Sequence, residues 1–244
     1  MAFLFDDSNT EYMFLFHAIA SSPPFSMACF ANTDETIGQT VMSIANHNSD
    51  VNYHRLVLCS TASDNKIAAD TRTSSGNSYS LTTTGFLINT WHHVCGVWEG
   101  ADDRRSYIDG GSKGTNSEGR SPSGLDRTGV GVLIRSTKSG YMSGFIAEAA
   151  IWAVALTDAE VAILAAGYSP LFVRPESLLV YWPMVRKLGT GQGIELIQRK
   201  QLLVGIEPDN GPHCPIIYPA ALQLASLRPP LAVIMENYKK MRVA

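Results

Sequence analysis

Apolar and polar residues alternate in two neighbouring stretches of the chain that we interpret as strands of one meander. The alternation covers residues 91–98 and again 104–108, and a period of two is typical of a strand with one buried face. Asp109-Gly110 follows the second stretch, and these residue types accept the positive φ angles of a tight hairpin. Residues 91–113 therefore predict two strands and the start of a third.

A second region combines a buried strand with a helix. Residues 145–152 are apolar enough to be buried on both faces of a sheet. Thr157 and Glu160 have the spacing of a capping box, and Gly167 is a suitable end signal. We therefore expect one short helix near residues 157–166.

Short apolar runs between turn residues predict the other strands. We expect them at residues 2–5, 12–16, 25–31, 40–45, 53–60, 66–73, 78–81, 130–135 and 178–183. Residues 114–128 are rich in Gly, Ser, Pro and Asn, and they predict a surface loop. About a dozen short strands with one late helix indicate an all-β, two-sheet antiparallel sandwich.

The last sixty residues differ in character, which predicts a sandwich domain over 1–184 and an extension over 185–244. Within the extension we expect short strands, extended chain and a final helix, at residues 194–197, 202–206, 208–219 and 231–241. Such a segment cannot readily close a core of its own. We therefore expect this C-terminal arm to pack on the sandwich or on neighbouring subunits.

Charge is low and unevenly distributed. The 244 residues are 45% hydrophobic and 17% charged, with a net charge of −3. Residues 1–184 hold 11 Lys and Arg against 18 Asp and Glu, whereas 185–244 hold 8 against 4. This balance gives no reason to expect nucleic-acid binding. A basic arm on an acidic body fits an arm that lies on a neighbouring copy, and a solvated arm is the alternative.

Targeting signals and cysteines suggest a compartment. The first residues lack the basic start and the apolar length of a signal peptide, and no apolar run is long enough to span a membrane. Cys29, Cys59, Cys95 and Cys214 are widely spaced, and we expect them to be buried free thiols. Assembly in a reducing cytoplasm would suit such thiols.

Several motifs occur in the order found in one fold family. They are Trp91-His92-His93-Val94, Tyr107-Ile108-Asp109-Gly110, Gly144-Phe145-Ile146-Ala147-Glu148 and Ala155-Leu156-Thr157-Asp158-Ala159-Glu160. With them, residues 1–184 resemble a concanavalin A-like jelly roll of the laminin G-like type. Members of that family commonly have Asp before the Glu of the late strand, where this chain has Ala147.

Catalysis is not expected. A retaining glycosidase needs two carboxylates about 5 Å apart. Glu148 has no acidic partner two or four positions away, and the Glu-x-Asp-x-x-Glu strand of the laminarinase-like enzymes of this fold is absent. We expect Glu148 to accept hydrogen bonds from backbone or hydroxyl donors at a sheet edge.

Two groups of residues are candidates for metal binding. Asp102, Asp103 and Asp109 offer the oxygen atoms that calcium prefers, although a solvated hairpin for the first two and a turn residue for the third explain them better. His92 and His93 are adjacent in a strand, so they face opposite sides and cannot share one ion. One of them is expected in the core beside Trp98. No other cofactor is indicated.

Glycan binding would require exposed aromatic side chains. The candidates are Trp98, Tyr141 and Tyr79, each of which could instead belong to the core or its rim.

The leading hypothesis is a non-enzymatic structural protein. Jelly rolls of this type, followed by an extension of the His-x-Pro-Ile-Ile-Tyr-Pro kind, resemble virion proteins of tailed bacteriophages. That resemblance implies a capsid-decorating or tail-associated protein that is assembled in the host cytoplasm. Its partners would be other virion proteins and copies of itself, with no nucleic acid and no membrane. The arm residues implied in partner binding are His213, Pro215, Ile216, Ile217 and Tyr218. A lectin-like glycan-binding module is the alternative, and a glycoside hydrolase is the third hypothesis.

Overall fold

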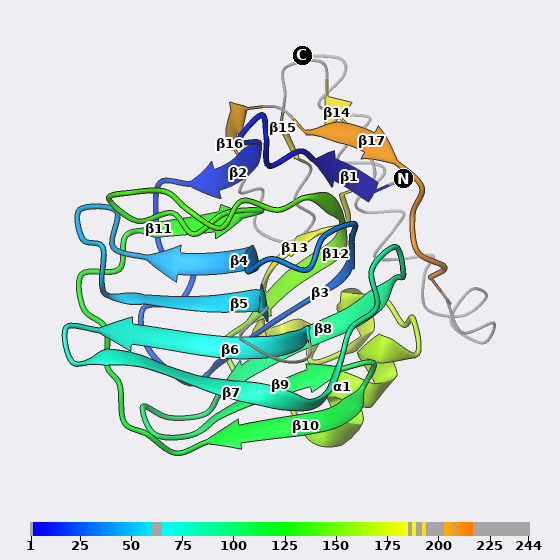
Figure 1. Cartoon of the computed structure of the whole chain (residues 1–244). Helices are drawn as coiled ribbons and strands as arrows, with labels where there is room; N and C mark the ends of the chain where they lie inside the picture. Colours follow the sequence, from blue (N-terminus) through cyan, green and yellow to red (C-terminus); the bar gives the residue numbers. More distant parts are fainter. Residues whose placement is uncertain are drawn as a thin grey trace, which may run out of the picture.

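Two large antiparallel sheets pack face to face (Figure 1). The computed structural model describes residues 2–59, 65–184, 187–188, 192–193, 203–206 and 208–216. This arrangement confirms the predicted two-sheet jelly-roll sandwich. We call the sheet that contains the strands from β4 (Gln39–Ala45) to β7 (Gly76–Gly85) the front sheet, because it faces the viewer in Figure 1, and the other the back sheet.

The back sheet has eight strands. In spatial order they are β10 (Gly111–Asn116), β9 (Arg104–Ile108), β8 (His92–Trp98), β3 (Phe25–Thr33), β12 (Gly144–Trp152), β1 (Ala2–Phe5) and β17 (Asp209–Gly211), with β13 (Leu178–Trp182) also paired to β12. Along β12, the first residues pair with β1 and the last pair with β13.

The front sheet has seven strands. In spatial order they are β16 (Leu203–Ile206), β2 (Tyr12–Leu15), β11 (Arg127–Val130), β4 (Gln39–Ala45), β5 (Tyr53–Cys59), β6 (Lys66–Thr73) and β7 (Gly76–Gly85). A separate pair consists of β14 (Lys187–Leu188) and β15 (Gln192–Gly193).

Apolar side chains of both sheets fill the space between them. Successive residues of a strand point to opposite faces, so each strand contributes every second side chain to this core. Met27 and Cys29 of β3 belong to the same buried cluster as Ile67 and Ala69 of β6. The sandwich is therefore closed by long-range strand pairing rather than by local structure.

The helix α1 (Asp158–Ala165) lies on the outer side of the back sheet. Its start confirms the predicted capping box, because the Thr157 side chain accepts from the Glu160 amide while Glu160 accepts from the Thr157 amide. Val161 and Leu164 pack with Trp152. Two short 3-10 helices, η1 (Pro170–Phe172) and η2 (Pro175–Ser177), follow α1.

The hairpin between β9 and β10 has the expected turn. Asp109 and Gly110 have φ angles of 51° and 75°, as a type I′ turn requires. Gly110 also touches the helix, because a Cβ atom at this position would lie 2.9 Å from the Ala162 Cα atom. The turn therefore sets how closely α1 approaches the sheet.

Two expectations from the sequence shift in the structure. The prediction of a strand at 130–135 is wrong, because β11 (Arg127–Val130) shares only Val130 with it and begins in the stretch expected to be a loop. The strand ends at Val130, since Gly131 has a φ of 74° and lies against the Phe5 ring. The loop expected at 114–128 begins later, because β10 continues to Asn116. This strand is at a sheet edge and is polar, so it lacks the apolar alternation that marks the other strands.

The described parts of the C-terminal arm pair with both sheets. β16 pairs with β2 at the edge of the front sheet, and β17 pairs with β1 at the edge of the back sheet. The strand expected at 202–206 is β16. The expected strand at 194–197 and the expected helix at 231–241 lie outside the described residues.

Among the described residues, no helix has both the length and the apolar character that crossing a lipid bilayer demands.

Candidate ligand-binding face on the front sheet

The outer face of the front sheet carries polar side chains on β5, β6 and β7. Ile67 and Ala69 of β6 point into the core. Asp70 and Arg72 occupy the alternate positions of the strand, so their side chains point outward. Residues paired across neighbouring strands point to the same side. The strand register therefore determines which side chains meet on this face.

The first row across the three strands is Arg55, Asp70 and Tyr79. The Arg55 Nε atom donates to Asp70 Oδ2 at 2.7 Å. The Asp70 side chain is only 2% exposed, and its second oxygen, Oδ1, has no hydrogen-bond partner among the described residues. Tyr79 next to it is 41% exposed. A buried acceptor without a donor thus lies beside an exposed aromatic ring.

The second row is Tyr53, Arg72 and Asn77. The Arg72 Nε atom and the Asn77 Oδ1 atom are buried, and in the part of the chain that the structure describes neither has a hydrogen-bond partner. The Arg55 guanidinium lies 5.4 Å from the centroid of the Tyr53 ring, and this cation–π contact helps to fix the orientation of the guanidinium. We call the six residues of the two rows the front-face site.

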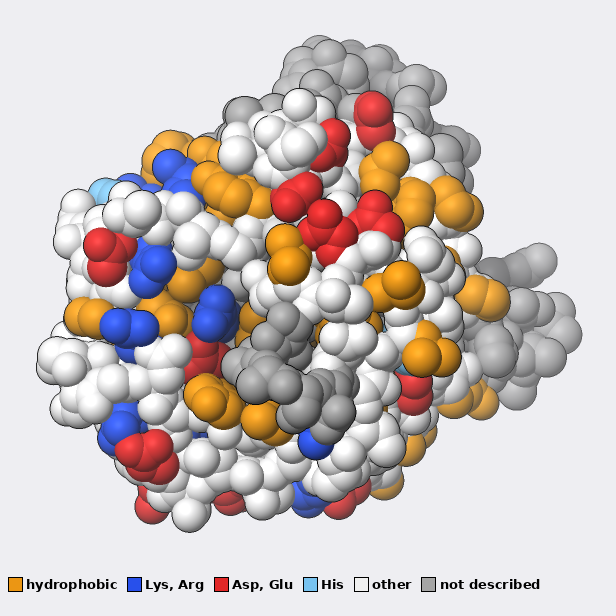
Figure 2. All heavy atoms as spheres, in the orientation of Figure 1, with side chains coloured by type: hydrophobic (Ala, Val, Ile, Leu, Met, Phe, Trp, Pro, Cys, Tyr) orange, Lys and Arg blue, Asp and Glu red, His pale blue; other side chains and the backbone are white. Residues whose placement is uncertain are grey.

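Figure 2 shows this face, with a Lys or Arg side chain and an Asp or Glu side chain together in a hollow over β5 and β6. Leaving a buried polar atom unpaired costs about 1–3 kcal/mol. The two adjacent rows contain three such atoms, Asp70 Oδ1, Arg72 Nε and Asn77 Oδ1. A ligand with hydroxyl groups or charged oxygen atoms would supply the hydrogen bonds that these atoms lack.

Burial raises the pKa of Asp70 above its usual value, although the charges of Arg55, Arg104 and Arg72 oppose this rise.

The three aromatic residues expected to bind glycans do not form one site. Tyr141 is half-buried against Tyr12, with ring centroids 6.1 Å apart, and Tyr12 lies on β2. Tyr79 lies on β7, which is five strand spacings from β2. Tyr141, next to β2, is therefore about 24 Å from Tyr79.

Trp98 is fully buried, which corrects the expectation that it could stack on a sugar. Its ring stacks on Phe25 at 4.7 Å, and its Nε1 atom donates to Thr71 Oγ1 at 2.8 Å. Neither face of the indole is open to a ligand.

The calcium candidates do not meet either. Asp102 and Asp103 precede β9 and Asp109 follows it, so the five residues of β9 separate them by about 17 Å. This corrects the expectation of one site from all three residues. Asp109 lies 2.7 Å from His92 Nδ1 and accepts from the His93 amide at 3.0 Å.

Asp102 and Asp103 instead line an open polar depression of about 880 Å³. Arg105 and Lys113 line the same depression, and their positive charges disfavour a divalent cation there. Among the described residues, no three His, Cys, Asp or Glu side chains are arranged to hold a metal ion.

A second polar cluster lies on the outer side of the back sheet, around Glu148. Glu148 has a φ of 55° at a bulge in β12 and is 4% exposed. It accepts a hydrogen bond from the Tyr181 hydroxyl, and its Oε1 atom lies 3.3 Å from His213 Nε2. Glu148 thus accepts from a hydroxyl as expected, but within an interior strand rather than at a sheet edge.

The arm residue His213 is held in this cluster. Burial lowers the pKa of His213, but hydrogen bonds with Cys214 and Glu148 outweigh it and raise the pKa to about 10. Ile216 packs against the buried cluster of Ala2, Ala147 and Cys214, whereas Pro215 is exposed. Ile217 and Tyr218 lie outside the described residues.

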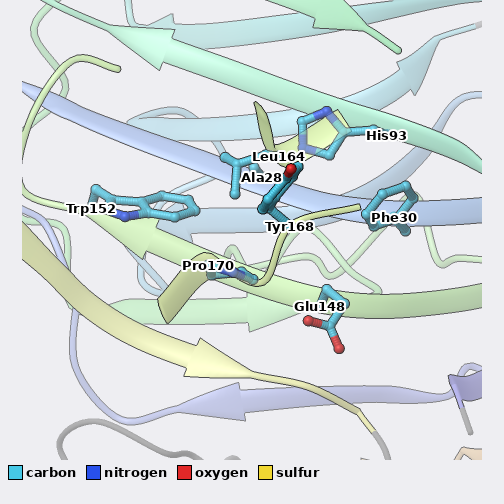
Figure 3. A pocket seen from close by; sticks show the side chains of 8 residues that line it. All are labelled: Ala28, Phe30, His93, Glu148, Trp152, Leu164, Tyr168 and Pro170. Atoms are coloured by element: carbon cyan, nitrogen blue, oxygen red, sulfur yellow. The ribbon is translucent and has the colours of Figure 1, made fainter. Parts of the chain in front are cut away.

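Figure 3 shows the small cavity beside Glu148. Its carboxylate points away from the other labelled side chains, which include His93, Tyr168 and Trp152. The cavity has room for about one water molecule. It is therefore too small for a sugar.

The two adjacent histidines face opposite sides as expected, but the buried one is not beside Trp98. His93 contacts Phe30 on the outer side of the back sheet, and burial lowers its pKa to about 4. His54 takes the place beside Trp98, with ring centroids 5.7 Å apart.

Sequence reasoning found Tyr79 but missed the other five residues of the front-face site. One signal was available, because Asp70 and Arg72 are two residues apart in the strand expected at 66–73 and must therefore lie on the same face of it. The residues of β5 and β7 that lie beside Asp70 and Arg72 can be identified only from the pairing register of the strands.

Comparison with known proteins supports the fold. A protein of Bacteroides ovatus, described as a candidate carbohydrate-binding protein, superposes with a TM-score of 0.59 at 17% identity, over 84% of this chain and 57% of that one. Domain 4 of the arabinanase AbnA from Geobacillus stearothermophilus, in complex with arabinotriose, gives 0.53 at 20% identity, over 62% and 71%. A heptameric SAP-like pentraxin of Limulus polyphemus gives 0.53 at 15% identity, over 84% and 94%.

At these identities the structures show a shared fold, and this chain spans little more than half of the Bacteroides protein. A search of curated proteins finds no match. The family described as "Concanavalin A-like lectin/glucanases superfamily" matches residues 7–162, which is more than half of the sequence. The chain therefore belongs to the concanavalin A-like lectin/glucanase superfamily.

Proposed function

We propose that the protein is a non-catalytic module that binds a glycan at the front-face site. The observation that carries this proposal is the buried Asp70 Oδ1 atom, which has no donor and lies next to the exposed ring of Tyr79. Sugars offer both parts of the match, because a hydroxyl group donates to the carboxylate while the apolar face of the ring packs on the aromatic side chain.

The structural neighbours add support. The Bacteroides protein is described as a candidate carbohydrate binder, and the AbnA domain was solved with arabinotriose. These descriptions support a binding role for this chain, but they do not identify its ligand.

A non-catalytic role fits the position of Glu148. This carboxylate is bonded to Tyr181, lies beside His213 and is only 4% exposed. It cannot reach a glycosidic bond from there, so we propose binding without hydrolysis.

A glycan array followed by titration calorimetry tests the proposal with Tyr79→Ala. We expect the variant to lose about tenfold or more in affinity, because the ring supplies the packing surface for the sugar. Tyr141→Ala is the matched control, since it removes a tyrosine from another part of the same face, and it should retain binding. If no glycan binds the unaltered protein, or if both variants bind as well as it does, the proposal fails.

A second proposal is an assembly role as a virion protein of a tailed bacteriophage, decorating the capsid or associated with the tail. Its support is the resemblance of residues 213–219 to virion extensions and the edge strands that the arm adds to both sheets. In this proposal, residues 1–184 form the sandwich, and 185–244 form the arm that holds neighbouring subunits or other virion proteins.

Antibody labelling of purified virus particles, combined with limited proteolysis of the free protein, tests this role. We expect labelled particles and an arm that becomes more resistant to cleavage on assembly. Unlabelled particles and an arm equally sensitive in every state would contradict it.

A further inference from the structure

We propose that the front-face site selects an acidic saccharide, whose carboxylate is held by the guanidinium groups of Arg55 and Arg72. This inference rests on the proposed glycan-binding function and adds the chemical class of the ligand. It follows from the charge of the site, from the unpaired atoms and from the way Arg55 is oriented.

The charge of the site is opposite in sign to that of the whole chain. The chain has a net charge of −3. The two rows of the front-face site contain the guanidinium groups of Arg55 and Arg72 but only one carboxylate, that of Asp70. The site therefore attracts anions on a protein that otherwise repels them.

Arg72 supplies the unused donor. Its Nε atom is buried and has no hydrogen-bond acceptor. Among the described residues, its side chain takes part in no ion pair with a carboxylate. An anionic oxygen from a ligand would satisfy this donor with a charge-assisted hydrogen bond, which is about twice as strong as a neutral one.

Arg55 is already fixed in position. Its Nε atom is used in the hydrogen bond to Asp70, and its guanidinium rests over the Tyr53 ring. Within the described structure its two terminal nitrogen atoms make no hydrogen bond, so their donors remain for a ligand. Because the guanidinium is already oriented, little side-chain entropy is lost on binding.

The remaining groups suit the rest of a sugar. Asp70 Oδ1 and Asn77 Oδ1 are buried acceptors without donors, and hydroxyl groups are the donors that a saccharide offers. Neighbouring strands are about 4.8 Å apart, and residues two apart on one strand are about 7 Å apart. Acceptors, guanidinium groups and the Tyr79 ring are therefore within reach of one or two linked sugar units. A simple anion such as phosphate would leave both acceptors and the ring unused.

The test compares pairs of glycans that differ only in charge. An array of oligosaccharides containing uronic or sialic acids is presented beside the same oligosaccharides with their carboxyl groups reduced to alcohols, and sulfated oligosaccharides form a third arm. We expect at least one carboxylate form to bind about tenfold or more tightly than its reduced partner. Its affinity should also fall as salt is raised.

Arg72→Gln is the critical variant, because its side chain contributes no ion pair to the described structure and can be removed without unfolding the sheet. It should abolish the preference for the carboxylate form while leaving the melting temperature nearly unchanged. Lys138→Gln is the matched control. It removes the same charge from the same face, over Tyr12 on β2, and should keep the preference.

Three results would overturn the inference. The first is that both members of every pair bind equally well and that Tyr79→Ala abolishes this binding. That result would refute the acidic class of ligand but would keep the proposed glycan-binding function. A preference for sulfated over carboxylate sugars would refute the carboxylate assignment. Absence of binding to every glycan would refute this inference together with the proposed function.

Discussion

The two sheets differ in what lies on their outer sides. On the back sheet, α1 and the 3-10 helices pack on apolar side chains such as Trp152, whose Nε1 atom donates to the Val173 carbonyl at 2.7 Å. Further along, Cys214 and Ile216 of the arm cover Ala147 and Phe145. On the front sheet, β5 to β7 instead carry the charged and aromatic side chains of the front-face site.

This difference shows how one strand architecture is used in two ways. The outer side of the back sheet is a second core, so it contributes to stability. The front-face site contains three buried polar atoms without partners, which is unfavourable for folding alone. Such a cost is expected where a protein keeps groups ready for a ligand. Substitutions on the outer side of the back sheet should therefore lower stability, whereas substitutions in the front-face site should lower ligand affinity and leave stability nearly unchanged.

The largest expected effect separates the faces by stability. Trp152→Ala should lower the free energy of unfolding by about 3–5 kcal/mol, because it leaves a cavity and removes the partner of the Val173 carbonyl. Tyr79→Ala, on the exposed face, should change it by less than about 0.5 kcal/mol. Urea denaturation measures both. Similar losses in the two variants would refute the distinction between the faces.

The next effect concerns the arm on the back sheet and depends on pH. The pKa of His213 is raised to about 10 in the folded protein, above the value of about 6.5 in an unfolded chain. The folded state therefore retains a proton that the unfolded state has released. The contribution of His213 is fully present below pH 6.5, decreases as pH rises toward 10 and is absent above it.

His213→Gln should accordingly cost about 1–2 kcal/mol near neutral pH, from the loss of the charged contact with Glu148, and almost nothing above pH 10. Unfolding of both proteins, measured by denaturant between pH 6 and 10.5, gives this difference. A difference that is constant over the range would show that the ion pair does not hold the arm.

The smallest effect concerns the cover provided by α1. Thr157→Ala removes the acceptor for the Glu160 amide and should cost about 1 kcal/mol. Thr157→Ser keeps the hydroxyl group and is the matched control. Thermal unfolding followed by circular dichroism measures both variants, and an equal loss in the two would mean that the cap is not what stabilises α1.

Local signals in the sequence predict much of the fold. Strand β6 and the strands β1 and β9 have the expected bounds, and the capping box of α1 and the turn at Asp109-Gly110 are confirmed. Each of these features depends on residues that are close in the sequence, so the pattern contains the whole interaction.

The site could not be predicted in the same way. Arg55, Asp70 and Tyr79 come from three strands, and only the pairing register places them in one row. Trp98 failed as a candidate because both sides of β8 are buried, one by the core and one by the α1 layer, so alternation did not reveal an exposed side. Burial on both faces is a tertiary property and leaves no local signal.

The most direct test of the ligand face is to map amide chemical-shift changes by NMR while an acidic oligosaccharide from the array is added. The account predicts that the changes concentrate on Asp70, Arg72, Asn77 and Tyr79, with those of β12 and α1 unaffected. Changes concentrated on the outer side of the back sheet, around Glu148 and His213, would contradict it.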